Sequence, residues 1–331
     1  MNSERLRTVV VGFGRIGAGY AEDPVMARHY RYATHAQVLR DHPMFGWDAV
    51  VDVSEMALDS ARERWGVAIA EKTLDKMSEQ YQPEVAVIAT GPESRIETIE
   101  ALPSLRAVIV EKPLGLTKTA ARTFLGLCRK KQILVQVNLW RRADSLFLQL
   151  SHGLLRKLIG EPQCVFGIYG NGLMNNGTHM VDFVRMLLGE VERAKAIGPA
   201  KSFDPGPLPG DVNVAFTLRM RSGVLVMMHP VDFVRYRENS LDIWGDMGRL
   251  SIMQEGLKLY FYPVGENRAM QGEREVASDQ PQELSSTVGE ALYHLYDNLA
   301  LALMDDRPLL SPGNSAYETM EVVHQILNSI K

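Results

Sequence analysis

The first part of the chain alternates short apolar runs with stretches of helical periodicity. The apolar runs cover residues 6–12, 47–53, 85–90, 107–110 and 133–137. Continuous runs of this kind are typical of strands buried on both faces of a parallel sheet. Helical patterns, for example at residues 55–65 and 117–130, separate them. The alternation predicts an α/β domain with a doubly wound parallel sheet over residues 1–140.

The pattern changes after about residue 144. A helix is predicted at residues 145–158, a strand at 164–169 and a second helix at 176–188. Strands then follow one another without helices, at residues 213–221, 224–234, 240–244, 249–253 and 258–262. Loops are expected at 202–211 and 263–287, and the chain ends in helices at 289–305 and 313–330. We therefore expect a second, α+β domain over residues 141–331, with a large, mostly antiparallel open sheet. An alternative is that the C-terminal helices pack back on the first domain.

Composition narrows the function classes. The chain has 331 residues, 46% of them hydrophobic, and a net charge of −4, which is ordinary for a soluble globular protein. Nothing in this balance points to a nucleic-acid or membrane partner. The first residues lack a signal-peptide pattern, and no apolar run approaches the ~18 residues of a membrane helix. The two cysteines form no disulfide framework and no zinc spacing, so we expect no metal site and a cytoplasmic location.

A glycine motif follows the first apolar run. It has the form GxGxxG and is made by Gly12, Phe13, Gly14, Arg15, Ile16 and Gly17. Its glycines permit a tight turn and close approach of backbone N–H groups to a pyrophosphate. Asp52 ends the second run, where a carboxylate accepts hydrogen bonds from a ribose and repels a 2′-phosphate. The pair predicts a Rossmann domain that binds NAD(H) in preference to NADP(H). The alternative is that Asp52 only ends a strand or caps the next helix.

The spacing between the motif and this acid is unusual. The acid normally lies about 20 residues past the glycines, but here the separation is 52 − 17 = 35 residues. The extra residues lie in the segment 18–33, which contains three tyrosines and one histidine. Ordered loops of this length often carry function. We expect the segment to cover the cofactor or the distal part of the substrate; the alternative is a decorative insertion or a subunit contact.

Further motifs bring a family resemblance. They are Ala89-Thr90-Gly91-Pro92, Glu111-Lys112-Pro113, Asn138 with Arg141-Arg142, the stretch from Asn175 to Asp182, and the turn around Gly245 and Gly248. Together with the glycine motif, they resemble the A-T-P loop, the E-K-P signature, the N-R-R stretch, the D-x-G-x-H-x-x-D helix and the I-x-G-x-x-G-x-L turn of the glucose–fructose oxidoreductase/inositol dehydrogenase (Gfo/Idh/MocA) family. The resemblance covers nearly the whole chain.

The resemblance implies an enzyme that acts on CH–OH groups of polyols or sugars, and a homodimer or homotetramer. It places the cofactor against residues 12–17, Asp52, Thr90, Gly91, Glu111, Lys112 and Asn138. It makes Lys112 a catalytic residue, with His179 and Asn175, and implies a cis peptide before Pro113. A lysine at a strand end can donate to the oxygen that gains or loses a proton as hydride moves. The alternative is a surface lysine at a strand end.

The helix motif departs from the family pattern at one position. Asn175 stands where the family more often has Asp, and Asn cannot stabilise an imidazolium by charge. His179 lies four residues further, so both are expected on one helix face. Asp182 can take the place of the missing charge, or it can be a structural residue. Tyr169 either faces the cleft or packs as a strand aromatic, and Arg141 with Arg142 either meets an anionic group or forms a surface pair.

The expected function is therefore NAD(H)-dependent interconversion of a secondary alcohol and a ketone on a sugar, sugar nucleotide or cyclitol. One rival is imine or enone reduction on the same fold, which needs the same proton donor beside a hydride. The other is a nucleotide-binding sensor without turnover. A sensor has no use for a proton relay, so Lys112 and His179 argue against it.

Overall fold

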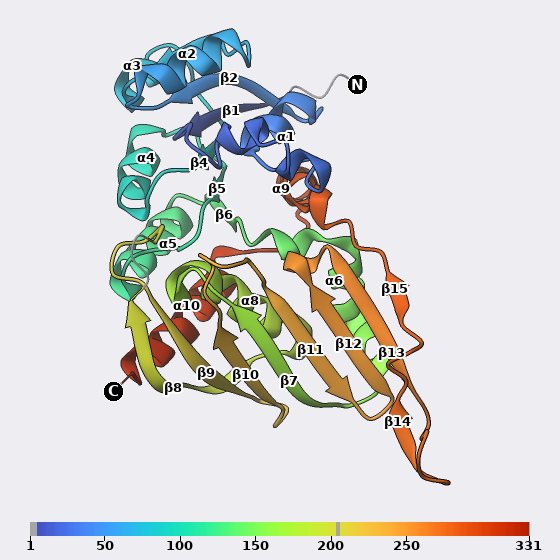
Figure 1. Ribbon diagram of the computed structural model, residues 1–331. Helices are drawn as coiled ribbons and strands as arrows, with labels where there is room; N and C mark the ends of the chain where they lie inside the picture. The colour runs from blue at the N-terminus through green and yellow to red at the C-terminus, as the bar shows by residue number, and fades with distance from the viewer. Residues whose placement is uncertain (1–4, 203–205, 331) are drawn as a thin grey trace. The chain divides into compact units, whose positions relative to one another are not determined.

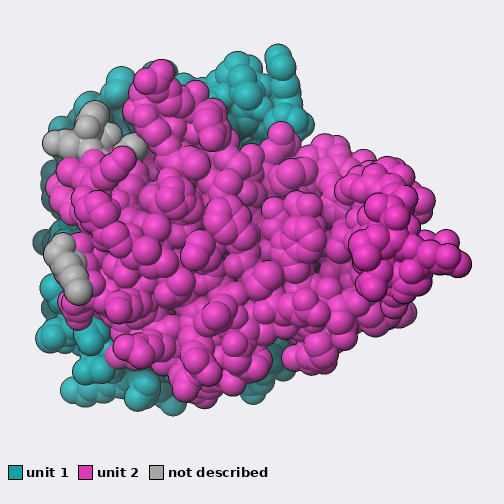
Figure 2. All heavy atoms as spheres, turned by 60° about the horizontal axis from the view of Figure 1, so that its bottom comes forward, with its two compact units in different colours: residues 1–143, 289–317 teal, residues 144–288, 318–331 magenta. Residues whose placement is uncertain are grey.

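The computed structural model describes residues 5–202 and 206–330 and divides the chain into two compact units (Figures 1 and 2). The first unit consists of Met1–Ala143 and Gly289–Tyr317, and the second of Asp144–Val288 and Glu318–Lys331. Residues 289–317, which the sequence prediction placed in the second domain, belong to the first unit, whereas residues 318–331, with most of the last helix, belong to the second.

The first unit contains a six-stranded sheet in which every pair of neighbours is parallel, in the order β3-β2-β1-β4-β5-β6. Its strands are β1 (Leu6–Val11), β2 (Phe45–Val51), β3 (Ile69–Glu71), β4 (Val85–Ile88), β5 (Ala107–Val110) and β6 (Leu134–Val137). The predicted parallel sheet is confirmed. Strand β3 was not predicted, because three residues are too few to form an apolar run.

The helices of this unit begin where side chains cap them. Hydroxyl groups of Thr34, Ser54, Thr73 and Thr117 accept hydrogen bonds from the first turns of four helices, which satisfies backbone N–H groups that have no partner within the helix. These helices are α1 (His35–Asp41), α2 (Glu55–Glu63), α3 (Leu74–Ser78) and α5 (Lys118–Lys130). Helices α4 (Arg95–Ala101) and α9 (Ala291–Asp305) complete the cover of the sheet, and α9 adds fully buried Leu295 and Leu299 to its core.

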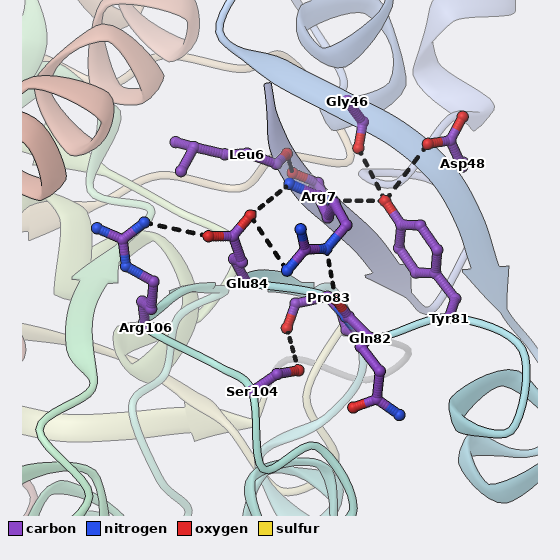
Figure 3. A network of polar contacts seen from close by, with 11 residues as sticks. Leu6, Arg7, Gly46, Asp48, Tyr81, Gln82, Pro83, Glu84, Ser104 and Arg106 are labelled. Atoms are coloured by element: carbon purple, nitrogen blue, oxygen red, sulfur yellow. Dashed lines mark hydrogen bonds and ion pairs between the residues drawn. The ribbon is translucent and has the colours of Figure 1, made fainter. Parts of the chain in front are cut away.

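A polar network joins the amino ends of the strands (Figure 3). Glu84, just before β4, accepts from Arg106 at 3.1 Å and pairs with Arg7 of β1 at 3.6 Å. Tyr81 donates to the carbonyl of Gly46 in β2 at 3.2 Å. Ligands of doubly wound sheets bind at the opposite, carboxyl ends of the strands. This network therefore ties the sheet together away from the expected site.

The second unit is built on a nine-stranded sheet in the order β14-β13-β12-β11-β7-β10-β9-β8, with β15 paired to β13. The strands are β7 (Pro162–Tyr169), β8 (Val191–Ser202), β9 (Val212–Met220), β10 (Leu225–Pro230), β11 (Ser240–Gly245), β12 (Gly248–Met253), β13 (Lys258–Glu266), β14 (Arg274–Val276) and β15 (Gln282–Leu284). Only β7 and β10 pair in parallel among the described strands of this sheet, so the predicted, mostly antiparallel sheet is confirmed.

Three predictions in this unit need correction. The helix expected at 145–158 is broken into α6 (Ser145–Gln149), a π-helical turn (Leu150–Leu154) and α7 (Leu155–Ile159), because Gly153 takes a φ of 119°. Strand β8 was missed, since it is rich in charged and small residues, and β14 and β15 lie inside the predicted loop 263–287. Residues 203–205 of the predicted loop 202–211 lie outside the described residues.

The two faces of the second sheet differ. One face carries buried side chains such as Phe216, Val226 and Ile243, and α6, α7 and α8 (Thr178–Leu188) lie on that side (Figure 1).

Helix α10 (Gly313–Asn328) is the last element of the chain. In the described part of the chain, no helix combines the length and the apolar character that crossing a membrane requires. Both cysteines are free, Cys128 buried and Cys164 exposed.

Candidate active site

The glycine turn has the shape of a dinucleotide cradle. Gly12 has a φ of +92°, and a Cβ there would lie 2.6 Å from Cγ2 of Thr90. A Cβ at Gly17 would lie 2.7 Å from the carbonyl oxygen of Gly12, so neither position admits a side chain. A Cβ at Gly14 would meet no heavy atom within 4 Å, so the chain is open there. Gly12 and Gly17 allow the tight turn because no side chain fits there, and the free space beside Gly14 leaves room for a pyrophosphate.

Asp52 lies directly after β2 and holds this turn. Its Oδ2 accepts a hydrogen bond from the N–H of Phe13 at 2.6 Å, and its Oδ1 accepts from Ser54 N–H at 2.8 Å. Ser54 caps α2, and Asp52 supports that cap by accepting from its N–H. A carboxylate offers about four lone-pair positions, so it retains acceptor capacity for ribose hydroxyls. The residues present fit a dinucleotide without a 2′-phosphate.

Two apolar residues beside Asp52 escaped the sequence analysis. Val53, between β2 and α2, is 88% exposed, and Met56, in the first turn of α2, is 81% exposed. Exposed apolar surface beside a ribose acceptor suits the flat face of a base. The signal was available, because an apolar residue directly follows the acid, but it was interpreted as the last residue of the strand.

The segment 18–33 leaves the glycine turn and returns to the same place. His35 N–H donates to the carbonyl of Ile16 at 3.1 Å, and Ala36 N–H to that of Gly17 at 2.9 Å, so α1 begins where the turn ends. Between them lie two short 3-10 helices, Gly19–Glu22 and Met26–Arg28.

The return half of this segment is anchored within the first unit. The rings of Tyr32 and Tyr293 lie 4.9 Å apart, and Arg31 pairs with Glu290 at 3.2 Å. Tyr30 meets the edge of Trp140 at 6.3 Å between ring centroids. The segment is thus an ordered excursion that reaches the residues after β6, while its Arg28 and His29 are exposed.

The Glu111-Lys112-Pro113 turn follows β5, and the peptide before Pro113 is cis. Arg95, only 1% exposed, donates to the carbonyl of Pro113 at 2.9 Å and also to the carbonyls of Glu111 and Leu114. Burial lowers the pKa of Arg95 to about 10, against the raising effect of the Glu111 charge, so the guanidinium is charged at neutral pH. A buried cation therefore fixes the backbone on both sides of Lys112. The sequence analysis did not identify Arg95.

Glu111 and Asn138 meet beside this lysine. Glu111 Oε1 accepts from Asn138 Nδ2 at 2.6 Å and from His35 Nε2 at 3.0 Å. Burial alone would raise the pKa of Glu111, but the hydrogen bonds from His35 and Asn138 and the charge of Lys112 hold that pKa below its usual value. Asn138 is 4% exposed, and its Oδ1 has no hydrogen-bond partner among the described residues. An orphaned acceptor at the ends of β5 and β6 fits a ligand that brings donors.

The remaining cofactor candidate, the Thr90-Gly91 loop after β4, adjoins the glycine turn. Ala89 N–H donates to the carbonyl of Val11 at 2.8 Å, and Thr90 Oγ1 lies 2.5 Å from Ser94 Oγ. The structure thus brings the predicted cofactor residues of the first unit to the carboxyl ends of β1, β2, β4, β5 and β6.

In the second unit, Asn175 lies in a π-helical turn, Gly172–Gly177, that leads into α8. Buried Asp211 accepts from the N–H groups of Met174 at 2.9 Å and Asn175 at 3.0 Å. Asn175 Nδ2 donates to the carbonyl of Asn171 at 3.0 Å. An aspartate cannot make that donation, which gives a physical reason for Asn at this position.

His179 is half-buried in the first turn of α8, whereas Asn175 lies in the π-helical turn before it. The prediction that both residues lie on one regular helix is therefore wrong. Asp182 is 3% exposed; it accepts from Thr319 at 2.8 Å and lies 4.0 Å from Arg185. These contacts agree with the structural alternative for Asp182.

Tyr169 is fully buried and does not face a cleft. Its hydroxyl donates to the carbonyl of Val214 at 2.6 Å and accepts from the same residue's N–H at 3.1 Å. It is a core aromatic, as one of the two alternatives held. Arg141 is 4% exposed and lies over the ring of Trp140 at 4.2 Å, so it is not part of a surface pair.

A parallel sheet with a glycine cradle and a ribose acceptor defines the first unit as a dinucleotide-binding Rossmann domain. Residues 6–139 match the model of an "oxidoreductase family, NAD-binding Rossmann fold", and residues 166–251 match the Gfo/Idh/MocA C-terminal domain. The chain belongs to the Gfo/Idh/MocA family of NAD-binding oxidoreductases.

Several known proteins are similar to it. An inositol 2-dehydrogenase/D-chiro-inositol 3-dehydrogenase of Shouchella clausii is 27% identical over 183 residues, which are 51% of this chain and 52% of that protein. A trans-1,2-dihydrobenzene-1,2-diol dehydrogenase of Mus musculus is 23% identical over 53% of this chain and 61% of that protein. The chain thus spans about half the length of the relatives it matches.

Solved structures share the fold over nearly the whole chain. The WlbA dehydrogenase of Bordetella pertussis, in complex with NADH and UDP-GlcNAcA, has a TM-score of 0.72 at 19% identity and covers 98% of this chain and 96% of its own. An oxidoreductase of Agrobacterium radiobacter, in complex with NAD+, L-tartaric acid and magnesium, has a TM-score of 0.73 at 16% identity, with 98% and 96% coverage.

Proposed function

We propose that this protein is an NAD(H)-dependent dehydrogenase that interconverts a secondary alcohol and a ketone on a sugar, sugar nucleotide or cyclitol. One observation carries the proposal. Lys112 is half-buried at the carboxyl end of β5, between the ionised Glu111 and a proline, with its backbone held by buried Arg95. The names of the inositol dehydrogenase relative and of the nucleotide-sugar complex support the substrate class.

The cofactor is assigned to the first unit. In the proposal its pyrophosphate lies against the turn 12–17 and its adenosine ribose at Asp52, with the adenine on Val53 and Met56. Thr90, Gly91, Glu111 and Asn138 hold the nicotinamide half. When bound, NAD supplies the hydride acceptor for the substrate carbon.

In this proposal, Lys112 accepts or donates the proton of the reacting substrate hydroxyl. In the oxidation direction, the neutral Lys112 amine accepts the substrate hydroxyl proton while the alcohol carbon loses its hydride and becomes a carbonyl. In the reduction direction, the ammonium returns that proton to the oxygen. The positive charge also stabilises developing alkoxide.

The second unit supplies the substrate contacts in this proposal. His179 serves as a second acid or base, since imidazole exchanges protons near neutral pH. Asn175 orients a substrate hydroxyl and does not ionise. Asp211 positions Asn175 by accepting two backbone N–H groups on the turn that carries it.

We further propose that a second copy of the chain covers the outer face of the second sheet, as a homodimer or as part of a homotetramer. We define the open face as Phe166, Arg193, Lys195, Thr217, Arg219, Leu225 and Met227, which the strand register places on one side. Phe166, Leu225 and Met227 are 42%, 56% and 45% exposed, which is unusual for neighbouring large apolar residues. Arg193, Lys195 and Arg219 lie at one end of this apolar strip.

Lys112→Ala tests the activity. We expect turnover of the responsive member of a sugar and cyclitol panel to fall by ~100-fold or more, with NADH affinity nearly unchanged. Lys118→Ala, which removes an exposed lysine at the start of α5, should leave both values as they are. Full turnover in Lys112→Ala would move the proton role to His179 and leave no part for Lys112.

A further inference from the structure

A buried chain of hydrogen bonds stands behind the Glu111-Lys112-Pro113 turn. Tyr296 of α9 and His35 of α1 are both fully buried. Tyr296 Oη lies 2.8 Å from His35 Nδ1, and His35 Nε2 lies 3.0 Å from Glu111 Oε1. The three side chains come from positions far apart in the sequence and connect two helices to the end of β5.

Counting hydrogens fixes the direction of this chain. Among the described residues, the Tyr296 hydroxyl has no hydrogen-bond partner besides His35 Nδ1. A buried hydroxyl must donate its hydrogen, so Nδ1 accepts it and the ring hydrogen lies on Nε2. The imidazole is then neutral and donates to Glu111. A doubly protonated ring would leave the tyrosine hydrogen without an acceptor inside the core.

Both donors to Glu111 end on the same oxygen. His35 Nε2 and Asn138 Nδ2 both bind Oε1, and no described residue binds Oε2. Asn138 Oδ1 is buried and also lacks a partner in the described part of the chain. Two acceptors thus remain beside Lys112. Unmade hydrogen bonds at buried acceptors are costly, so this pair is suited to a ligand that presents hydroxyl or amide donors.

We propose that His35 and Tyr296 are positioning residues that hold one Glu111 oxygen in the core, so that the other oxygen, with Asn138, receives donors from the nicotinamide riboside half of the cofactor. The inference rests on the proposed function for the identity of the ligand. Tyr296 fixes the imidazole tautomer, and the imidazole fixes the carboxylate. Neither residue touches the substrate or the cofactor.

The arrangement makes cofactor affinity depend on pH through Glu111. The charged groups that face this carboxylate are Lys112 beside it and Arg95 from α4, itself near Glu93. His35, Asn138 and Tyr296 also face it, and the hydrogen count above makes them neutral. The native pKa of Glu111 is low, so the ionised acceptor persists at neutral pH and is lost only when the pH falls through that value. Removing the His35 donor raises the pKa and moves the loss to higher pH.

The test measures NADH dissociation constants by fluorescence between about pH 5.5 and about pH 8.5. Tyr296→Phe deletes one hydroxyl and keeps the ring, and His35→Leu removes the donor. We expect both to weaken NADH about fivefold or more at the acid end and less at the alkaline end. His35→Gln, whose amide N–H can replace Nε2–H, should restore most of the affinity. Tyr293→Phe, one turn away on α9 and stacked on Tyr32, is the matched control.

Nitrogen-15 NMR of the histidine rings provides a readout without cofactor. The His35 signals, identified among the eight histidines by their loss in His35→Gln, should show a neutral ring protonated on Nε2 at neutral pH. In Tyr296→Phe the ring should exchange between tautomers. A wild-type ring that carries its hydrogen on Nδ1, or on both nitrogens, at neutral pH would overturn the inference.

Different results would overturn the positioning role of His35 and Tyr296 and the proposed dehydrogenase function. Unchanged NADH affinity in Tyr296→Phe and His35→Leu at every pH, together with weakened binding in Glu111→Ala, would overturn the positioning role and leave the proposed function intact. If Glu111→Ala and Lys112→Ala both keep wild-type NADH affinity and turnover, the proposed function itself is wrong. Circular dichroism and the melting temperature confirm that each variant is folded.

Discussion

Asp52 has two hydrogen-bonding partners within the protein, and this affects what a substitution there measures. Its carboxylate holds Phe13 of the glycine turn and the start of α2. Its charge should also exclude a 2′-phosphate by repulsion. We expect NADH to bind about tenfold or more tightly than NADPH, a difference of about 1.4 kcal/mol or more. Asp52→Ser should narrow that gap in a fluorescence titration of both cofactors.

A matched variant separates charge from geometry. Asp52→Asn keeps one side-chain oxygen that can accept from Phe13 or Ser54, but it removes the charge. If repulsion sets the preference, Asn and Ser should narrow the gap alike. If the glycine turn sets it, Asn should retain the wild-type ratio. Equal affinity of the wild type for the two cofactors would rule out the preference altogether.

Residues with short-range signals could be predicted from the sequence, and residues with distant partners could not. The glycine turn, Asp52 and Lys112 were identified because each follows an apolar strand pattern in a recognisable motif. Arg95, His35 and Tyr296 carry no such pattern. His35 and Tyr296 are 261 residues apart in sequence, so only the folded chain shows that they share a hydrogen bond.

At the scale of elements, the π-helical turn before α8 sets the surroundings of Asn175. Asn175→Asp replaces the donor to the Asn171 carbonyl with a negative acceptor, so repulsion should destabilise the turn by about 1–3 kcal/mol. Thermal unfolding measures this loss. The new carboxylate should also stabilise the charged form of His179, which moves the acid limb of the pH–rate profile to higher pH.

Asn175→Ala removes the donor without adding charge, and it serves as the control. It should raise KM and lower kcat, because Asn175 orients the substrate in the proposed function, and it should leave the acid limb where it is. An acid limb that stays in place in Asn175→Asp as well would mean that His179 does not titrate within the observed range.

The excursion 18–33 is the element that most distinguishes this chain from the usual glycine-motif spacing. Trypsin should cleave faster after Arg28 than after Arg31, because Arg28 is exposed and Arg31 is paired with Glu290. If the segment covers the cofactor or the substrate, NADH or substrate should slow that cleavage, and deleting residues 24–29 should raise KM for one of them.

Arg28→Gln is the control for this experiment, because it removes the cleavage site without shortening the segment. Its kinetics should match the wild type if the length of the excursion matters and the charge does not. Cleavage that is indifferent to both ligands, with unchanged kinetics in the shortened variant, would leave only the structural interpretation of the segment.

Element prediction succeeded where burial was uniform and failed where it was not. Strands β1, β4 and β5 lie inside a parallel sheet and β6 lies at its edge, but nearly all residues of the four strands are apolar, so the pattern is clear. Strand β8 is half-exposed, with lysine and arginine at outward positions, and its pattern resembles a loop. The π-helical turns depend on local geometry at Gly153 and Asn171 that hydrophobic periodicity does not report.

At the scale of the whole molecule, the proposed association of two copies depends on the open face of the second sheet. A second copy that buries Phe166, Leu225 and Met227 would remove large apolar side chains from water. Met227→Lys should weaken such a dimer by about 100-fold or more, about 2.7 kcal/mol, because it buries a charge beside the cations Lys195 and Arg219. Sedimentation equilibrium measures the dissociation constant.

The control and the sign of the introduced charge make this test specific. Val234→Lys places the same charge on an 82% exposed apolar residue outside the open face, and it should leave the dissociation constant unchanged. Met227→Glu should disrupt the dimer less than Met227→Lys, because the cations at that end of the apolar strip can pair with a carboxylate. A wild-type protein that sediments as a monomer at all concentrations, or a dimer indifferent to Met227→Lys, would show that the open face is not where copies of the chain meet.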